Sequence, residues 1–198
     1  MRIILASGSP RRKELLAEVV ERYEIIPSKF DEGELKNEIK DPEELVEILS
    51  YEKAKYVLLK ISTDKEREDL EIIAADTIVY FDGKVLGKPV DEKDAFRMLK
   101  ALQGNDNYVY TGMTVIIKKD NEIIKDTVNT KTTVTMKEMS DQDILDYIGT
   151  KDPLDKAGAY AIQGIGSRNI KGFDGSYNSV VGLDIDKLKE ILKKNSVI

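Results

Sequence analysis

The 198-residue sequence contains no cysteine and no histidine. Their absence excludes a thiolate nucleophile, a disulfide framework, a Ser-His-Asp triad and a zinc site of the common Cys/His kind. Any general base in this protein must therefore be a carboxylate. Any catalytic metal should be a hard cation such as Mg²⁺ or Mn²⁺, bound through oxygen ligands.

Long apolar runs and an excess of positive charge are missing as well. No apolar run approaches the roughly 18 residues that a membrane span needs, and the N-terminal apolar segment is too short for a signal peptide. The net charge of -6 argues against nucleic-acid binding through bulk charge. We therefore expect a cytoplasmic protein with no membrane or nucleic-acid partner, folded as a single domain over residues 1–198.

The stretch from Ile3 to Leu16 has the pattern of a strand, a tight loop and a helix start. Ser7-Gly8-Ser9 supplies hydroxyls and a glycine that permits close backbone approach, and Pro10 begins the helix after the N-capping serine. Arg11 and Arg12 place two cations at the positive end of the helix dipole, which favours an anion in front of them. The pattern indicates a phosphate site, with a capped surface helix and solvated arginines as the alternative.

Two charged residues stand in apolar surroundings further along the chain. Lys53 falls on the apolar arc of a helix expected from Asp41 to about Ser62, where its stem could snorkel or its ammonium could face a cleft. Asp76 interrupts the most apolar run, the strand expected at 70–81. A carboxylate there is costly to bury unless it is paired, bound to a metal or open to a cleft.

The remaining pattern predicts alternating helices and strands of an α/β protein. Neither a P-loop nor a complete dinucleotide fingerprint is present. The expected elements are a strand at 23–26, a polar acidic loop at 28–40, a charged connector at 63–69, a hairpin turn at 82–83, a helix at 91–102, strands at 108–117 and 122–136 around a turn at 120–121, a helix at 140–149, a glycine-rich loop at 151–175, a strand at 176–183 and a helix at 184–195.

A series of ordered motifs runs along nearly the whole chain: LASGSPRR (5–12), YEKA (51–54), AADTIV (74–79), LGKP (86–89), YTGMTV (110–115), LDKAGAYAIQG (154–164) and GSYNSVVGL (175–183). Together they resemble the Maf, or septum-formation-inhibitor, nucleoside triphosphate pyrophosphatases. The resemblance implies an elongated mixed β-sheet with flanking helices and a central cleft, as in the inosine triphosphate pyrophosphatases. It also implies hydrolysis of a nucleoside triphosphate to monophosphate and pyrophosphate in a housecleaning role.

The functional residues of the family carry over onto matching positions of this sequence. The resemblance implies a catalytic group, with Asp76 as proton acceptor, comprising Arg12, Lys53, Asp76 and Lys88. Because phosphoryl chemistry depends on charge neutralisation, we expect a divalent cation, Mg²⁺ or Mn²⁺, on the carboxylate oxygens of Glu32 and Asp76. Substrate-binding residues would be Ser7, Ser9, Arg11, Arg12, Thr77 and Gln163.

Arg11, Thr77 and Gln163 also match the subgroup that prefers dTTP and UTP, whereas the subgroup acting on 7-methyl-GTP differs at all three. Tyr51 stands where the family usually has arginine, a departure that affects none of these roles. The alternatives are a regulatory nucleotide-binding protein that acts on cell division through a protein partner, and a purine-selective pyrophosphatase. The sequence leaves open a homodimer, a link to septum-formation arrest and a preference for modified pyrimidine nucleotides.

Overall fold

The computed structural model describes residues 1–61, 69–119 and 122–195. The predicted end of the long helix at Ser62, most of the predicted connector at 63–69 and the predicted turn at 120–121 lie outside these residues. The chain divides into two compact units. Unit 1 comprises Met1–Asp76, Thr111–Thr130 and Gly182–Ile198, and unit 2 comprises Thr77–Tyr110 and Lys131–Val181.

Within the described residues the strands form one mixed sheet of seven, in the order β2-β1-β3-β5-β6-β7 with β4 added beside β3. The strands are β1 (Arg2–Leu5), β2 (Glu24–Ile25), β3 (Leu70–Phe81), β4 (Lys84–Leu86), β5 (Asp106–Lys119), β6 (Glu122–Met136) and β7 (Ile170–Asp174). β1 pairs in parallel with both β2 and β3, whereas β4 and β7 add antiparallel pairs. The mixed α/β sheet with flanking helices expected from the sequence is confirmed.

The helices account for most of the remaining chain. They are α1 (Pro10–Ala17), α2 (Gly33–Glu38), α3 (Pro42–Ile61), α4 (Glu92–Leu102), α5 (Asp141–Gly149), α6 (Tyr177–Val181) and α7 (Ile185–Lys194), with short 3-10 turns at Asp152–Asp155, Ala157–Ala159 and Gly164–Asn169. No helix in the described parts of the chain is long and apolar enough to cross a membrane.

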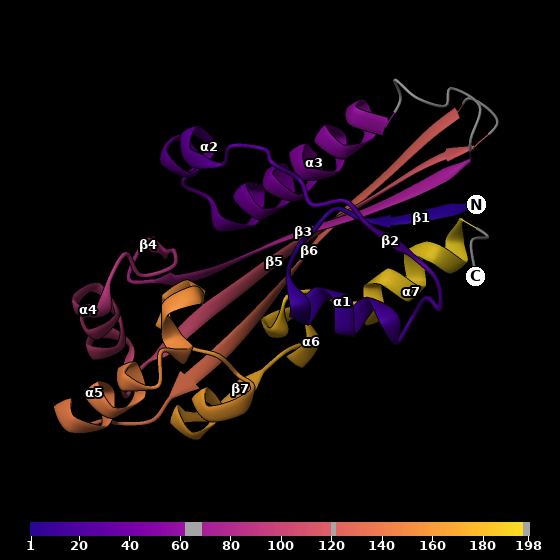
Figure 1. Cartoon of the computed structure of the whole chain (residues 1–198). Coiled ribbons are helices and arrows are strands. Elements are labelled where there is room, and N and C mark those ends of the chain that lie inside the picture. The colour runs from indigo at the N-terminus through magenta and orange to yellow at the C-terminus, as the bar shows by residue number, and fades with distance from the viewer. Residues whose placement is uncertain (62–68, 120–121, 196–198) are drawn as a thin grey trace. The chain divides into compact units, whose positions relative to one another are not determined.

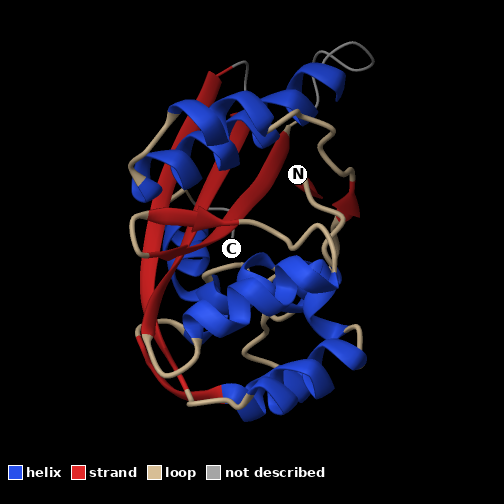
Figure 2. Cartoon of the chain, turned by 90° about the vertical axis from the view of Figure 1, so that its left-hand side faces the viewer, coloured by secondary structure: helices blue, strands red, loops and turns tan. Residues whose placement is uncertain are grey.

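In unit 1, helices cover both faces of the strands. α3 lies along one face, and α1 and α7 lie on the other (Figure 1); Figure 2 shows the long α3 beside the red strands from another direction. Leu70, Ile72 and Ala74 of β3 pack with Ala54 and Val57 of α3 in one buried cluster. Because side chains alternate along a strand, every second residue from Leu70 to Asp76 lies on the face towards α3.

α3 approaches β5 closely at Gly112. A Cβ atom at this glycine would lie 2.1 Å from the Val46 carbonyl oxygen, a separation that real structures do not allow. Beyond this point, Ser50 Oγ of α3 and Thr114 Oγ1 of β5 lie 2.8 Å apart, and both residues are buried. The helix that carries Lys53 is therefore fixed on the sheet by backbone contact and by a buried hydroxyl pair.

Unit 2 contains the β3–β4 hairpin and a second apolar core. The hairpin turns at Asp82 and Gly83, which have φ values of 49° and 74°, as the sequence predicts for a two-residue turn. Residues of α4 and α5 pack in this core, and each of the two helices starts with a side-chain cap. Asp91 accepts from the Asp94 amide, and Ser140 forms a capping box with Asp143.

The sequence-based expectation was wrong in three segments. The predicted loop at 28–40 contains α2, which has no buried residue and therefore shows no apolar periodicity. The predicted strand at 176–183 is instead the helix α6, because Ser176 accepts hydrogen bonds from the amides of Ser179 and Val180. The β-branched residues of this segment favour a strand, but the hydrogen bonds to Ser176 outweigh that preference. The loop predicted at 151–175 ends in the unforeseen strand β7.

Candidate functional site

Asp76 lies in unit 1 on the face of β3 that α3 covers. It is spaced by two, four and six residues from Ala74, Ile72 and Leu70, which pack against α3. Its side chain is 7% exposed, so an unpaired charge there would be costly. The apolar strand thus holds a carboxylate directly beneath the helix that carries Lys53.

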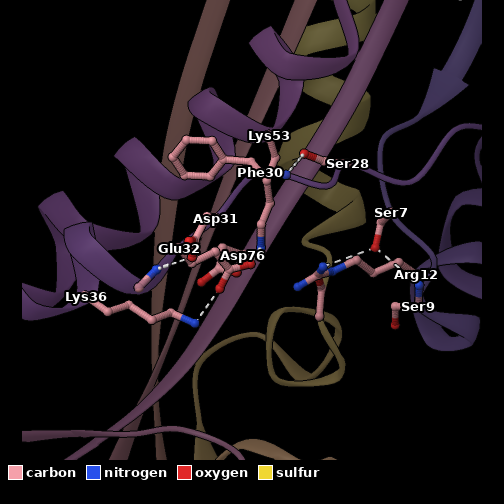
Figure 3. Close-up of polar contacts among 12 residues, drawn as sticks. Ser7, Ser9, Arg12, Ser28, Phe30, Asp31, Glu32, Lys36, Lys53 and Asp76 are labelled. Carbon is pink, nitrogen blue, oxygen red and sulfur yellow. Dashed lines mark hydrogen bonds and ion pairs between the residues drawn. The ribbon is translucent and has the colours of Figure 1, made fainter. Parts of the chain in front are cut away.

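Lys53 joins two carboxylates. Its ammonium forms an ion pair with Asp76 Oδ1 and another with Glu32 Oε1, the second at 2.6 Å. The Lys53 side chain is only 12% exposed, and Figure 3 shows it directed between the two acids. The sequence left open whether the Lys53 stem snorkels to solvent or its ammonium faces a cleft. In the structure the ammonium is directed towards the two carboxylates and not along the protein surface into solvent.

Asp76 retains one oxygen without a protein partner. In the part of the chain that the structure describes, Asp76 Oδ2 is buried and has no hydrogen-bond partner. Buried carboxylate oxygens are normally hydrogen-bonded, so an unsatisfied one indicates a position for a water molecule, a metal ion or a ligand. Oδ1 is engaged by Lys53, and Oδ2 is the atom available for chemistry.

Glu32 precedes α2 and is paired on both oxygens. Oε1 contacts Lys53 at 2.6 Å, and Oε2 contacts Lys36 one helical turn further on. Burial by itself would raise the pKa of Glu32, but the charges of Lys53 and Lys36 outweigh it and lower the pKa to about 2. Glu32 is therefore ionised at neutral pH, as a cation ligand must be.

Arg12 is held by two acceptors at the start of α1. Its Nε donates to the Gly182 carbonyl at 2.8 Å, and its Nη1 donates to Ser7 Oγ at 3.2 Å. Ser7 Oγ also accepts from the Ser9 amide at 3.3 Å. Burial lowers the pKa of Arg12 from its ordinary value, and the carboxylates of Asp76 and Glu32 oppose that shift. These contacts fix a guanidinium in the electrostatic field of both acids.

The comparison with known proteins identifies the family of this chain. The family model described as Maf-like protein matches residues 2–195. The chain belongs to the Maf family. The resemblance to this family that the sequence motifs indicated is thereby confirmed.

Curated relatives extend over nearly the full length of the Maf chain. A dTTP/UTP pyrophosphatase of Clostridium botulinum (strain Eklund 17B / Type B) is 47% identical over 196 residues, covering 98% of this chain and 99% of the relative. Proteins of the same name are 44% identical in Clostridium beijerinckii, covering 98% and 99%, and 45% identical in Thermoanaerobacter sp. (strain X514), covering 98% and 96%.

Unit 1 of this Maf chain brings together most of the residues singled out in the sequence. Glu32, Lys53 and Asp76 form the ion-paired cluster, and Ser7 and Arg12 form the hydrogen-bonded group at α1. Ser9 and Arg11 also belong to this unit, although the Ser9 side chain makes no hydrogen bond that caps α1. The N-capping role predicted for the Ser9 hydroxyl is therefore not observed.

The other three predicted residues lie in unit 2. Thr77 follows Asp76 directly in β3, Lys88 is exposed two residues after β4, and Gln163 is partly buried before a 3-10 turn. The structure adds two residues that sequence reasoning missed. Gly182, whose φ is 135°, presents its carbonyl to Arg12, and Lys36 contacts Glu32. For Lys36, the spacing of four residues after Glu32 is typical of an ion pair on a helix and could have indicated this contact.

Proposed function

We propose that this chain hydrolyses dTTP and UTP to the monophosphate and pyrophosphate. The observation that carries the proposal is 47% identity over 98% of the chain to a relative named dTTP/UTP pyrophosphatase. The site in unit 1 supports it with cations for phosphate oxygens and with a buried carboxylate oxygen that has no protein partner among the described residues.

The proposed reaction is attack of water on the α-phosphorus. A bond forms between the water oxygen and the α-phosphorus while the bond to the α,β-bridging oxygen breaks, and pyrophosphate leaves. Asp76 Oδ2 accepts the water proton, since Oδ1 is engaged by Lys53 and the chain has no histidine or cysteine. Phosphoryl chemistry depends mainly on positioning and charge neutralisation, for which we propose Arg12, Lys53 and Lys88.

A divalent cation, Mg²⁺ or Mn²⁺, fits the proposed site through Asp76 and Glu32. In the described residues, no group of three or more His, Cys, Asp or Glu side chains is arranged to hold a metal. Two carboxylates suffice for Mg²⁺, which commonly keeps water ligands and shares phosphate oxygens of its substrate. The unpartnered Asp76 Oδ2 has two lone pairs, so one could face the cation while the other accepts the proton of the attacking water. When bound, the cation would neutralise phosphate charge.

We further propose that Arg11, Thr77 and Gln163 set the preference for pyrimidines. The Gln163 amide offers one donor group and one acceptor, which can read the edge of a thymine or uracil ring. Replacing Gln163 by alanine should lower kcat/KM for dTTP about tenfold or more, because a lost polar contact typically costs about 1–3 kcal/mol. Gln142→Ala on α5 is the matched control and should leave kcat/KM unchanged.

The proposal is tested with a panel of nucleoside triphosphates in ¹⁸O-labelled water. We expect dTTP and UTP to be the best substrates, with pyrophosphate as the product and the label in dTMP or UMP. Faster hydrolysis of GTP or ATP would contradict the pyrimidine preference. Label in pyrophosphate would place the attack at the β-phosphorus, and saturable nucleotide binding without hydrolysis would indicate a regulatory binding protein instead.

A further inference from the structure

Glu32 is held by two lysines in very different environments. Lys53 lies on the long helix α3 with 12% of its side chain exposed, and also pairs with Asp76. Lys36 lies on the six-residue helix α2, which buries no residue, and its side chain is 39% exposed. Figure 3 shows the two ammonium groups reaching Glu32 from these separate elements. The acid is therefore neutralised by one buried cation and one exposed cation.

The two ion pairs differ in how easily they separate. Breaking a buried pair leaves an uncompensated charge and is strongly unfavourable, so Lys53 stays with its carboxylates. The pair between Lys36 and Glu32, spaced by four residues at the start of α2, is more exposed and contributes less, because water solvates the Lys36 ammonium when the two part. An incoming cation that needs a Glu32 oxygen would therefore displace Lys36 and leave Lys53 in place.

Lys53 already occupies Glu32 Oε1, so a divalent cation that binds Glu32 would meet the Lys36 ammonium at Oε2. Two positive groups at the same carboxylate oxygen repel each other. Building on the metal site proposed above, we propose that Lys36 is a positioning residue that competes with the divalent cation for Glu32. Lys36 holds the carboxylate towards the site when no metal ion is bound, and releases it when one binds. The metal requirement of the enzyme is thus set partly by an exposed lysine outside the catalytic group.

The test is Mn²⁺ binding without substrate, measured from the electron paramagnetic resonance signal of free Mn²⁺. Lys36→Met removes the ammonium and keeps a side chain of similar length. The Kd of this variant for Mn²⁺ should therefore be about threefold lower or more than that of the wild type. Lys36→Arg keeps the competing charge and should bind as the wild type does. Lys40→Met is the matched control, since Lys40 donates to the Asn37 carbonyl and should not affect the Kd.

Equal or weaker Mn²⁺ binding by Lys36→Met would overturn the competition, because a merely structural lysine would not tighten binding when removed. Mn²⁺ bound equally by wild type and Lys36→Met, with normal dTTP hydrolysis, refutes this inference and leaves the proposed function intact. Hydrolysis of dTTP with no Mn²⁺ binding in any variant would remove both the metal site and the competition. Absence of dTTP hydrolysis alongside tighter Mn²⁺ binding would refute the proposed function alone.

Discussion

Asp76 and Glu71 are both buried acids on β3, five residues apart and on opposite faces of the strand. Asp76 faces α3 and meets the ammonium of Lys53. Glu71 faces away from α3 with 0% of its surface exposed, and neither of its carboxylate oxygens has a hydrogen-bond partner in the described structure. One strand therefore holds two buried carboxylates: Asp76 is ion-paired with Lys53, and Glu71 has no hydrogen bond within the described residues.

The difference shows what the protein supplies to each acid. Burial raises the pKa of Glu71 to about 7, because nothing compensates the loss of water around the charge. Glu32, which shares Lys53 with Asp76, has its pKa lowered to about 2 despite partial burial. Burial alone favours a neutral acid, and a nearby lysine is what preserves a charged one. The two faces of β3 can be tested separately on this basis.

The largest effect is expected for Asp76→Asn. Asparagine keeps the volume and can accept from Lys53, but it is a far weaker proton acceptor and cannot bind a metal as an anion. We expect kcat for dTTP to fall about 10²- to 10⁴-fold at neutral pH while nucleotide still binds. Glu71→Gln, on the other face of the strand, is the control and should keep turnover within about twofold of wild type. Pyrophosphate release and a melting curve on the same samples measure both outcomes, and an Asp76→Asn enzyme that melts early yet turns over normally would remove Asp76 from catalysis.

Lys53→Met should have the next largest effect. The change removes the ammonium from Asp76 and Glu32, so phosphate charge that develops in the transition state loses a neutralising partner. We expect kcat to fall about 10²-fold, and the melting temperature should fall as well because the buried Asp76 loses its counter-charge. Lys55→Met, two residues along α3, is the matched control because Lys55 pairs with Glu52 and lies over the Tyr51 ring. Near-normal turnover of Lys53→Met would show that the ion pair is structural.

The contrast between the two acids also marks what the sequence could predict. β3 was predicted with its observed ends, because Asp82-Gly83 interrupts the run of β-branched residues, and Asp76 stood out as a charge inside that run. Glu71 did not stand out, because a charge near the start of a strand has the same local pattern whether it is exposed or buried. The contact of Arg12 with Gly182 spans 170 residues and depends on tertiary structure. Local periodicity contains no information on such a pair.

Glu71 should also make stability depend on pH. The folded protein keeps Glu71 protonated up to about pH 7, whereas the unfolded chain releases the proton near its ordinary pKa of 4.5. The folded state therefore binds more protons between these values, so the contribution is full below pH 4.5 and is lost as the pH rises through 7. The loss should total up to about 3 kcal/mol of the free energy of unfolding.

Glu71→Met isolates this effect, because methionine fills a similar volume and does not titrate. We expect the variant to gain stability over the wild type by more at pH 8 than at pH 5, in urea unfolding followed by circular dichroism. Contributions from Glu32 and other acids occur in both proteins and cancel in the difference. A gain that does not depend on pH would mean that the folded protein holds Glu71 with an ordinary pKa.

The smallest effect is expected at Thr114, a buried polar residue that is neither ion-paired nor unsatisfied. Its hydroxyl lies 2.8 Å from Ser50 Oγ and 3.0 Å from Thr127 Oγ1, and Ser50 also donates to the Glu47 carbonyl at 2.9 Å. Thr114→Val keeps the shape and leaves Ser50 one remaining hydrogen bond, so it should cost about 1 kcal/mol of stability without changing kcat. A double-mutant cycle with Ser50→Ala separates the pair from the two single changes, and should give a coupling energy of at least about 0.5 kcal/mol. Additive effects of the two changes on stability would show that the two hydroxyls do not interact. A loss of turnover in Thr114→Val would mean that the packing of α3 on β5 sets the position of Lys53.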